Sequence, residues 1–511
     1  MKVVPNLGLS AFGAVSLLCS LSILICYTLD LAPIFLSQTC WRVAESNDPV
    51  NDHFIDLQQQ SSPLEASPKV LDWKEAAGEW WEDSSLNSSD RNWVGRHTLH
   101  EYLKKGTLSY DANVEKYFLS KLEARQFPEN CADTHWIAYQ THDSGLLSCT
   151  HIIMPVLMIG IFKGDKHTVL PISRPPGKPD LPTFDGCGER KDKHLGCFFN
   201  LTNCTLEAAP VRSQFIQNLR NGTQGAIWDS LWEDNTTAPG GLSILKSFLF
   251  RYPLPAYNDS WRAPKLEFWN ELEKQGKTGV HLGSSGALGK PRESQIDFAL
   301  HGMLSSWIMR QTTDRIKQIA DEIMSKYSDE NGRPLWKPPV LALHVRQTDK
   351  KQEDPYFRKH KKYRSIEEYV EQMKSLEAQF RFRWESLFII SDSGSALQSL
   401  AVALNNVTGP PDSLNGQERK RFIMYDWSFD NALIEKRGGH TQIPPEMKRS
   451  AQEHFLATLY IISKIADYAI VCYSSNVGRF MSELIGGKHR LASPYAVGPN
   501  AYSLDYSWVH D

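Results

Sequence analysis

The sequence has few cysteines, little net charge and none of the common nucleotide-binding or metal-binding signatures. Nine cysteines in 511 residues are too few for a small scaffold held by disulfides. A net charge of −3 argues against a general binder of nucleic acid or a polybasic membrane binder, and a mean hydropathy of −0.40 excludes a polytopic membrane protein. No Walker A, G-x-G-x-x-G, G-x-S-x-G or H-E-x-x-H motif stands where it could function, and there is no D-x-D to hold a metal on a nucleotide diphosphate. What remains is a chain of globular composition with room for roughly two to four domains.

One apolar run is long enough to cross a membrane. Residues 7–29 carry no charge, and about 20 helical residues span a hydrocarbon core. The preceding tail, residues 1–6, carries Lys2 and the amino terminus as its positive charges. A positive tail stays cytoplasmic, so the run predicts a type II signal-anchor with the rest of the chain in the lumen. The alternative is a cleaved signal peptide, which has a shorter apolar core and a small-residue cleavage site that we do not find after Leu29.

Glycosylation sequons agree with this orientation, because all of them follow the apolar run. Seven N-x-S/T sequons are more than the two or three expected, roughly, by chance from so loose a pattern. They predict a glycoprotein of the secretory pathway, and we expect the Golgi membrane. The sequons are at Asn87, Asn200, Asn203, Asn221, Asn235, Asn258 and Asn406.

Five of the nine cysteines cluster in one part of the chain. No C-x-x-C or H-x-x-x-H spacing accompanies them, which argues against the alternative of a zinc site. In a lumenal protein such a cluster predicts disulfides, whose pairing the sequence leaves open. The cluster consists of Cys131, Cys149, Cys187, Cys197 and Cys204.

The chain before residue 336 divides into two parts. Residues 30–130 are polar and interrupted, which predicts a lumenal stem, and residues 131–335 form the expected amino-terminal catalytic lobe with the cysteine cluster. Within this lobe the apolar run 151–162 predicts a strand, and the amphipathic pattern over 298–327 predicts one long helix.

Residues 336–511 alternate short apolar runs with helical patterns. The alternation predicts an α/β fold with a doubly wound parallel sheet, which binds ligands at the carboxyl ends of its strands. A capping box of Ser365 and Glu368 marks the start of one helix. The expected strands are 338–345, 386–391, 421–426 and 468–473, and the expected helices are 365–380, 394–404, 450–466 and 474–487.

Polar side chains follow the first of these strands. Arg346 and Lys350 suit a diphosphate, because arginine offers a bidentate fork and lysine a point charge. Residues 346–364 contain eight Lys/Arg and three Asp/Glu, so their local net charge is 8 − 3 = +5 in a chain of net −3. The surplus predicts an anionic ligand, although a solvated basic loop would have the same composition.

Two further strand ends carry candidate ligand contacts. Asp392 follows the strand 386–391 and could bind a ribose or a base. The segment from Ser474 to Arg479 opens a helix whose amide groups, with Ser475 and Asn476, suit an anion. Helix capping alone would also explain the serines at both places.

Three stretches resemble one enzyme family. ALHVRQTDK (342–350), FIISDS (388–393) and IADYAIVCYSSNVGR (465–479) are similar to the α1,6-fucosyltransferase family, which includes the N-glycan core fucosyltransferases and the bacterial chitin-oligosaccharide fucosyltransferases. The resemblance covers about residues 338–487 well. It implies a two-lobed GT-B-like fold, GDP-fucose as donor, no metal or other cofactor, and inversion at the fucose carbon.

The resemblance also implies roles for particular residues. Arg346 matches the arginine that binds the diphosphate, and the carboxylate that acts as general base would be Asp354 or Glu353. The candidate catalytic residues are therefore Asp354, Glu353, Arg346 and Lys350. The candidate donor-binding residues are His344, Arg346, Asp349, Asp392, Ser474, Ser475, Asn476 and Arg479.

The sequence departs from the family pattern at several positions. Gln347 replaces a second arginine, Ser393 an acidic residue, and Asn476 a glutamine, while Leu459 stands near the place of a family aspartate. The family's SH3 domain does not follow residue 487. The resemblance implies an α1,6-fucosyltransferase of N-glycan cores, with GDP-fucose and a glycan or glycoprotein as partners. The predicted anchor adds the membrane as a partner, the net charge argues against nucleic acid, and a homodimer is one option. Two alternatives stay open: a GDP-fucose-dependent transferase for another acceptor, and a catalytically degenerate lumenal glycan-binding protein.

Overall fold

Five parallel strands form the central sheet of the carboxyl-terminal half. Their order is β11-β9-β6-β7-β8, and every neighbouring pair is parallel. Their bounds confirm four predicted strands to within two residues, and β11 was not predicted. The strands are β6 (Val340–Val345), β7 (Ser386–Ser391), β8 (Phe422–Tyr425), β9 (Tyr468–Val471) and β11 (Ala501–Ser503).

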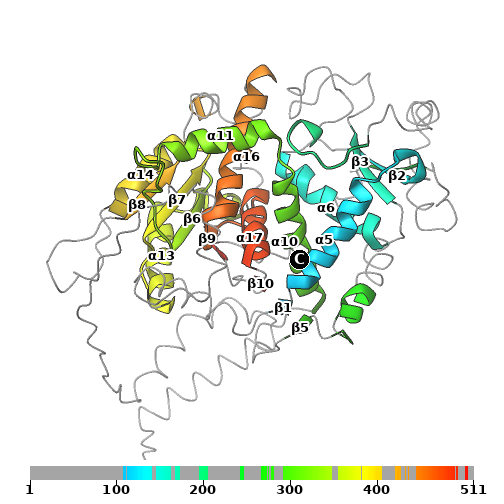
Figure 1. Ribbon diagram of the computed structural model, residues 1–511. Coiled ribbons are helices and arrows are strands. Elements are labelled where there is room, and N and C mark those ends of the chain that lie inside the picture. Colours follow the sequence, from blue (N-terminus) through cyan, green and yellow to red (C-terminus); the bar gives the residue numbers. More distant parts are fainter. Residues whose placement is uncertain are drawn as a thin grey trace, which may run out of the picture. The chain divides into compact units, whose positions relative to one another are not determined.

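Only part of the chain is described by this computed structural model (Figure 1). All the described residues belong to one unit, Lys69–Asp511. They are residues 108–110, 112–140, 146–162, 167–172, 195–204, 242–246, 266–272, 274–275, 278–280, 292–347, 355–380, 382–405, 421–426, 432, 435–436, 445–489, 491–492 and 501–504.

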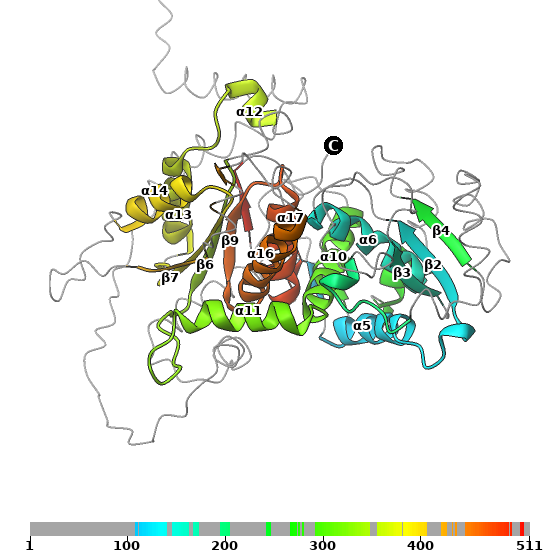
Figure 2. The ribbon, with the colours of Figure 1, turned by 90° about the horizontal axis from the view of Figure 1, so that it is seen from above.

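Helices cover both faces of the central sheet, as a doubly wound fold requires. Alternate side chains of β6 enter different cores: Leu341 and Leu343 pack with one group of helices, and Val340 and Ala342 with the other. Figure 2 shows α13 and α14 on one side of the sheet and α16 and α17 on the other. These helices are α13 (Ile366–Phe380), α14 (Gly394–Asn405), α16 (Pro445–Ile465) and α17 (Asn476–His489), and the short α12 (Pro355–His360) precedes α13.

The amino-terminal half has a smaller parallel sheet of its own. Its order is β3-β2-β4, and α5 and α6 pack beside it. A third, antiparallel sheet joins β10 to β1 and β5, so strands from the two ends of the chain pair with each other. The bounds are β1 (Leu108–Tyr110), α5 (Ala112–Gln126), β2 (His135–Gln140), α6 (Leu146–Phe162), β3 (His167–Ile172), β4 (Leu242–Lys246), β5 (Thr278–Val280), α10 (Arg292–Arg310), α11 (Asp314–Ser325) and β10 (Leu491–Ala492), with 3-10 turns η1 (Cys131–Asp133) and η2 (Leu195–Cys197).

The folded body begins before residue 131, where the sequence placed the start of the catalytic lobe. The helix α5 lies within the range assigned to the stem, and its side chains Val114, Phe118 and Leu122 are buried in the larger core.

The predicted strand over 151–162 is wrong, because these residues belong to α6. Its sequence from Ile152 on is almost entirely apolar, with Ile153, Met154 and Leu157 buried and Pro155 inside the helix. Periodicity cannot distinguish a helix buried all round from a buried strand.

The predicted helix over 298–327 is two helices, α10 and α11. The chain leaves the helix at Gln311 to Thr313, where it meets a neighbouring segment: the Asn200 N–H donates to the Gln311 carbonyl (2.7 Å) and the Thr313 N–H to the Phe198 carbonyl (3.0 Å). Thr313, with extended backbone, then begins α11. The break is stable because this segment satisfies the backbone groups that an unbroken helix would pair internally.

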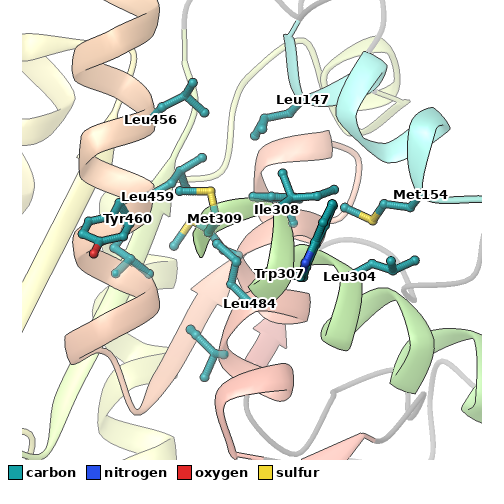
Figure 3. Packing of buried hydrophobic residues seen from close by; sticks show 14 of the residues in the cluster. Leu147, Met154, Leu304, Trp307, Ile308, Met309, Leu456, Leu459, Tyr460 and Leu484 are labelled. Atoms are coloured by element: carbon teal, nitrogen blue, oxygen red, sulfur yellow. The ribbon is translucent and has the colours of Figure 1, made fainter. Parts of the chain in front are cut away.

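The larger core joins both halves of the chain. Figure 3 shows Leu147 and Met154 of α6, Leu304 and Trp307 of α10, and side chains of α16 and α17 in one apolar cluster. Leu459, which stands in the place of a family aspartate, is fully buried in this cluster.

The cysteine cluster is only partly disulfide-bonded. Cys131 and Cys204 form one disulfide, and Cys197 is also disulfide-bonded. Cys149 is a buried thiol in α6, so its predicted disulfide is wrong. It is buried in the larger core, where it packs as a small hydrophobic residue.

The predicted anchor, residues 7–29, lies outside the described residues. Among the residues that the structure describes, no helix is both long and apolar enough to cross a membrane. Two of the predicted sequons are described, and the side chains of Asn200 and Asn203 are both exposed.

Candidate functional site

Three of the predicted site residues meet at the carboxyl edge of the central sheet. Arg346 follows β6, Asp392 follows β7, and Ser475 lies between β9 and α17. The Arg346 Nη1 donates to the Ser475 hydroxyl (3.1 Å), and its Nε lies 3.9 Å from the Asp392 carboxylate. The side chains of Arg346 and Asp392 are 20% and 15% exposed. The guanidinium is thus oriented by two other strand ends and still accessible to a ligand.

Asp392 joins the ends of two neighbouring strands. Its Oδ1 accepts a hydrogen bond from the Gln347 backbone N–H (2.8 Å), while its Oδ2 faces Arg346. The Gln347 side chain donates to the Arg364 carbonyl (3.2 Å). Gln347 therefore helps to hold the chain after β6, whereas a second arginine at this position would have added a cation.

The first turn of α17 lies very close to the end of β9. The Ser475 hydroxyl accepts from the Val477 N–H (3.3 Å), which is the bond of a helix N-cap. A Cβ added to Gly478 would lie 2.3 Å from the Cys472 carbonyl oxygen, so only glycine fits there. Arg479, one residue later, donates to the Asn476 side chain (2.7 Å). Capping therefore explains Ser475 in part, but the same hydroxyl also accepts a hydrogen bond from the Arg346 guanidinium.

The beginnings of three helices differ in their charge. Glu368 accepts from the Ser365 N–H (2.7 Å) at the start of α13, which confirms the predicted capping box. At the start of α14, Glu435 supplies a carboxylate. The first turn of α17 has no acidic residue, and Arg346 and Arg479 lie beside it. Because a helix amino end attracts negative charge, α17 is the end best suited to an anionic ligand.

Glu435 is a site residue that the sequence reasoning missed. Its carboxylate binds Ser393 (2.9 Å), which stands where the related family has an acidic residue. The two residues are 42 positions apart, and no local pattern connects the stretch around Glu435 with the strand β7. Nothing short of a known strand order would have revealed the contact.

His344 is buried below the arginine, with 4% of its surface exposed. Burial, and secondarily the charge of Arg346, lower the pKa of His344 to about 3. Its backbone carbonyl accepts from the Tyr369 hydroxyl (3.0 Å). The imidazole is therefore neutral at neutral pH.

The lowered pKa of His344 predicts an acid-dependent loss of stability. The unfolded chain takes up a proton near pH 6.5 and the folded chain only near pH 3, so His344 contributes stability above pH 6.5 that is lost as the pH falls between these values. At about 1.4 kcal/mol per pKa unit, the loss amounts to a few kcal/mol. We expect the free energy of unfolding, measured by urea titration from pH 7 to pH 4, to fall less steeply in His344→Gln than in the wild type. If the free energy of unfolding fell equally steeply with pH in both proteins, the lowered pKa assigned to His344 would be wrong.

Four predicted residues lie outside the described part of the chain: Asp349, Lys350, Glu353 and Asp354. Ser474 is half-buried in the turn before α17. The structure thus brings together His344, Arg346, Asp392, Ser475, Asn476 and Arg479 at one sheet edge, and the choice of general base stays a prediction.

This chain has a distant likeness to a solved fucosyltransferase structure. No family model and no curated protein matches the sequence. Among solved structures, a crystal structure of POFUT1 in complex with GDP-fucose matches with 12% sequence identity and a TM-score of 0.34, over 73% of this chain and 98% of that chain. A likeness at this level does not place the chain in a family.

Proposed function

We propose that this protein is an inverting glycosyltransferase that moves fucose from GDP-fucose to a glycan. One observation carries the proposal: Arg346, the arginine of the HVRQTDK motif, donates to Ser475 at the amino end of α17, whose first turn contains no acidic residue. A guanidinium, a hydroxyl and the amides of a helix amino end together suit a diphosphate. The two parallel sheets with flanking helices agree with the two-lobed fold that the motif implies.

In the proposed reaction the diphosphate is the leaving group. The acceptor oxygen forms a bond to the fucose carbon while the bond from that carbon to the phosphate oxygen breaks, and attack from the opposite face inverts the carbon. Arg346 and the α17 amides stabilise the charge that develops on the diphosphate. Asp354 or Glu353 takes the proton of the acceptor hydroxyl. The protein's own cations neutralise the diphosphate, so the proposal needs no metal.

For the acceptor we propose the core N-acetylglucosamine of N-glycans, with an α1,6 linkage, in the Golgi lumen. The support is the motif resemblance together with the predicted anchor and sequons. A transferase for another acceptor is the second candidate. Two observations favour it over a strict family member: Gln347 is hydrogen-bonded to the Arg364 carbonyl instead of supplying a cation, and Leu459 is buried in the apolar core.

The test is GDP release from GDP-fucose by the purified lumenal part of the protein. N-glycans with and without an accessible core, other oligosaccharides and Ser/Thr peptides serve as acceptors. We expect release that depends on an N-glycan acceptor. Release with a different acceptor would support fucosyl transfer but contradict the proposed α1,6 linkage to the N-glycan core. GDP binding without turnover on any acceptor would favour the glycan-binding protein, and no GDP binding would overturn the proposal.

A further inference from the structure

Glu435 contacts the turn between β7 and α14 through both of its carboxylate oxygens. Its Oε1 accepts from the Ser393 hydroxyl (2.9 Å), and its Oε2 from the Gly394 N–H (3.0 Å). The Ser395 hydroxyl is a third, longer donor at 3.4 Å. The residue itself comes from the chain between β8 and α16, so it joins two segments that are distant in sequence.

Local hydrogen bonds also hold the turn that Glu435 contacts. The Ser393 N–H donates to the Ser391 hydroxyl (3.1 Å), and the Ser393 hydroxyl accepts from the Ala396 N–H (3.2 Å) as an N-cap. Ser393 is 4% exposed. Because Glu435 supplies two acceptor oxygens to this helix end, its removal would leave the Ser393 hydroxyl and the Gly394 N–H without the carboxylate that they bind.

The turn also determines where Asp392 lies. Asp392 immediately precedes Ser393, and its carboxylate binds the Gln347 N–H and faces Arg346. A short chain of contacts therefore leads from Glu435 through Ser393 to Asp392 and on to the guanidinium. The bonds in this chain measure 2.9 Å from Ser393 to Glu435 and 2.8 Å from Gln347 to Asp392, with 3.9 Å between Arg346 and Asp392.

We infer that Glu435 is a positioning residue for the donor site: it fixes the turn 392–394, so that Asp392 orients Arg346 toward the diphosphate. The inference rests on the proposed function for its effect on GDP-fucose. Without Glu435 the turn relaxes, and Asp392 no longer holds the guanidinium in the orientation that a diphosphate needs. Because Arg346 contacts the diphosphate both in the bound donor and as it leaves, donor binding and turnover are both expected to fall, each by less than in Arg346→Ala.

The experiment compares Glu435→Ala with Lys436→Ala, an exposed neighbour that controls for a charge change in the same segment. We expect Glu435→Ala to weaken GDP binding and raise KM for GDP-fucose about tenfold, which corresponds to about 1.4 kcal/mol, and to lower kcat by less than Arg346→Ala does. The GDP affinity and KM of Glu435→Gln should lie between those of the wild type and Glu435→Ala, because the amide keeps one acceptor oxygen. Lys436→Ala should behave as the wild type. Unchanged GDP affinity and KM in Glu435→Ala, or an equal loss in Lys436→Ala, would overturn the inference.

A ligand-independent measurement separates this inference from the proposed function. Amide hydrogen exchange at Gly394 and Ala396 should be faster in Glu435→Ala than in Lys436→Ala, with exchange in the strand β9 unchanged. Equal exchange at the turn would refute the positioning role whatever the protein binds. If the wild type binds no GDP while the turn does exchange faster, the proposed function fails and the contact is confirmed as a brace of the turn alone.

Discussion

Replacing Arg346 by alanine is expected to reduce the turnover of GDP-fucose by about a hundredfold or more, because it removes a charge-assisted contact that strengthens as the diphosphate leaves. Ser475 and Asp392 would each lose the guanidinium that lies between them. The measurement is GDP release under saturating acceptor, with GDP affinity determined separately by calorimetry.

Two further variants sharpen this prediction. Arg346→Lys keeps the charge but not the planar fork, so we expect a loss smaller than that of the alanine variant and still well below wild-type activity. Arg333→Ala, which removes an exposed arginine before β6, is the matched control and should leave turnover unchanged. Wild-type turnover of Arg346→Ala would refute the assignment of the site.

The second large effect concerns a buried carboxylate that links three helices. Glu483 of α17 is 1% exposed and accepts from Ser305 of α10 (2.9 Å) and pairs with His151 of α6 (2.9 Å). Burial by itself raises the pKa of Glu483, but His151, His301 and Ser305 together outweigh burial and lower the pKa below the usual value. The carboxylate is therefore charged and paired inside the protein.

Glu483→Ala is expected to cost about 3–5 kcal/mol of the free energy of unfolding, as removal of one partner from a buried pair does. Urea denaturation measures it, and Glu330→Ala, an exposed position, is the control. A double-variant cycle with His151→Ala should give a coupling above about 1 kcal/mol. Because the pKa of Glu483 is lowered, its stabilisation is present above the unfolded pKa and is lost as the pH falls through the folded pKa. If Glu483→Ala lost no more free energy of unfolding than Glu330→Ala does, the stabilising role of Glu483 would be wrong.

The parallel sheet could be predicted because its strands are short apolar runs with polar ends. β6 and β7 were found to within two residues, and the positions just after them pointed to Arg346 and Asp392 without any structure. The helix α6 could not be predicted, since its residues from Ile152 on are almost all apolar and show no distinct face. Glu435 and Glu483 were missed for another reason: each acts on partners dozens or hundreds of residues away, and local sequence carries no trace of such a contact.

The helix α17 cannot be separated from the amino-terminal half of the chain. It begins at the candidate site, and about two turns later its Glu483 is bound by α6 and α10, while Leu484 and Ile485 enter the shared core. The strand β10 that follows it pairs with β1, at residues 108–110. A fragment starting at residue 336 would keep every motif that identifies the donor site. It would, however, expose the apolar face of α17 and leave Glu483 without His151 and Ser305. We therefore expect the smallest piece of this chain that can fold around the site to begin no later than Leu108.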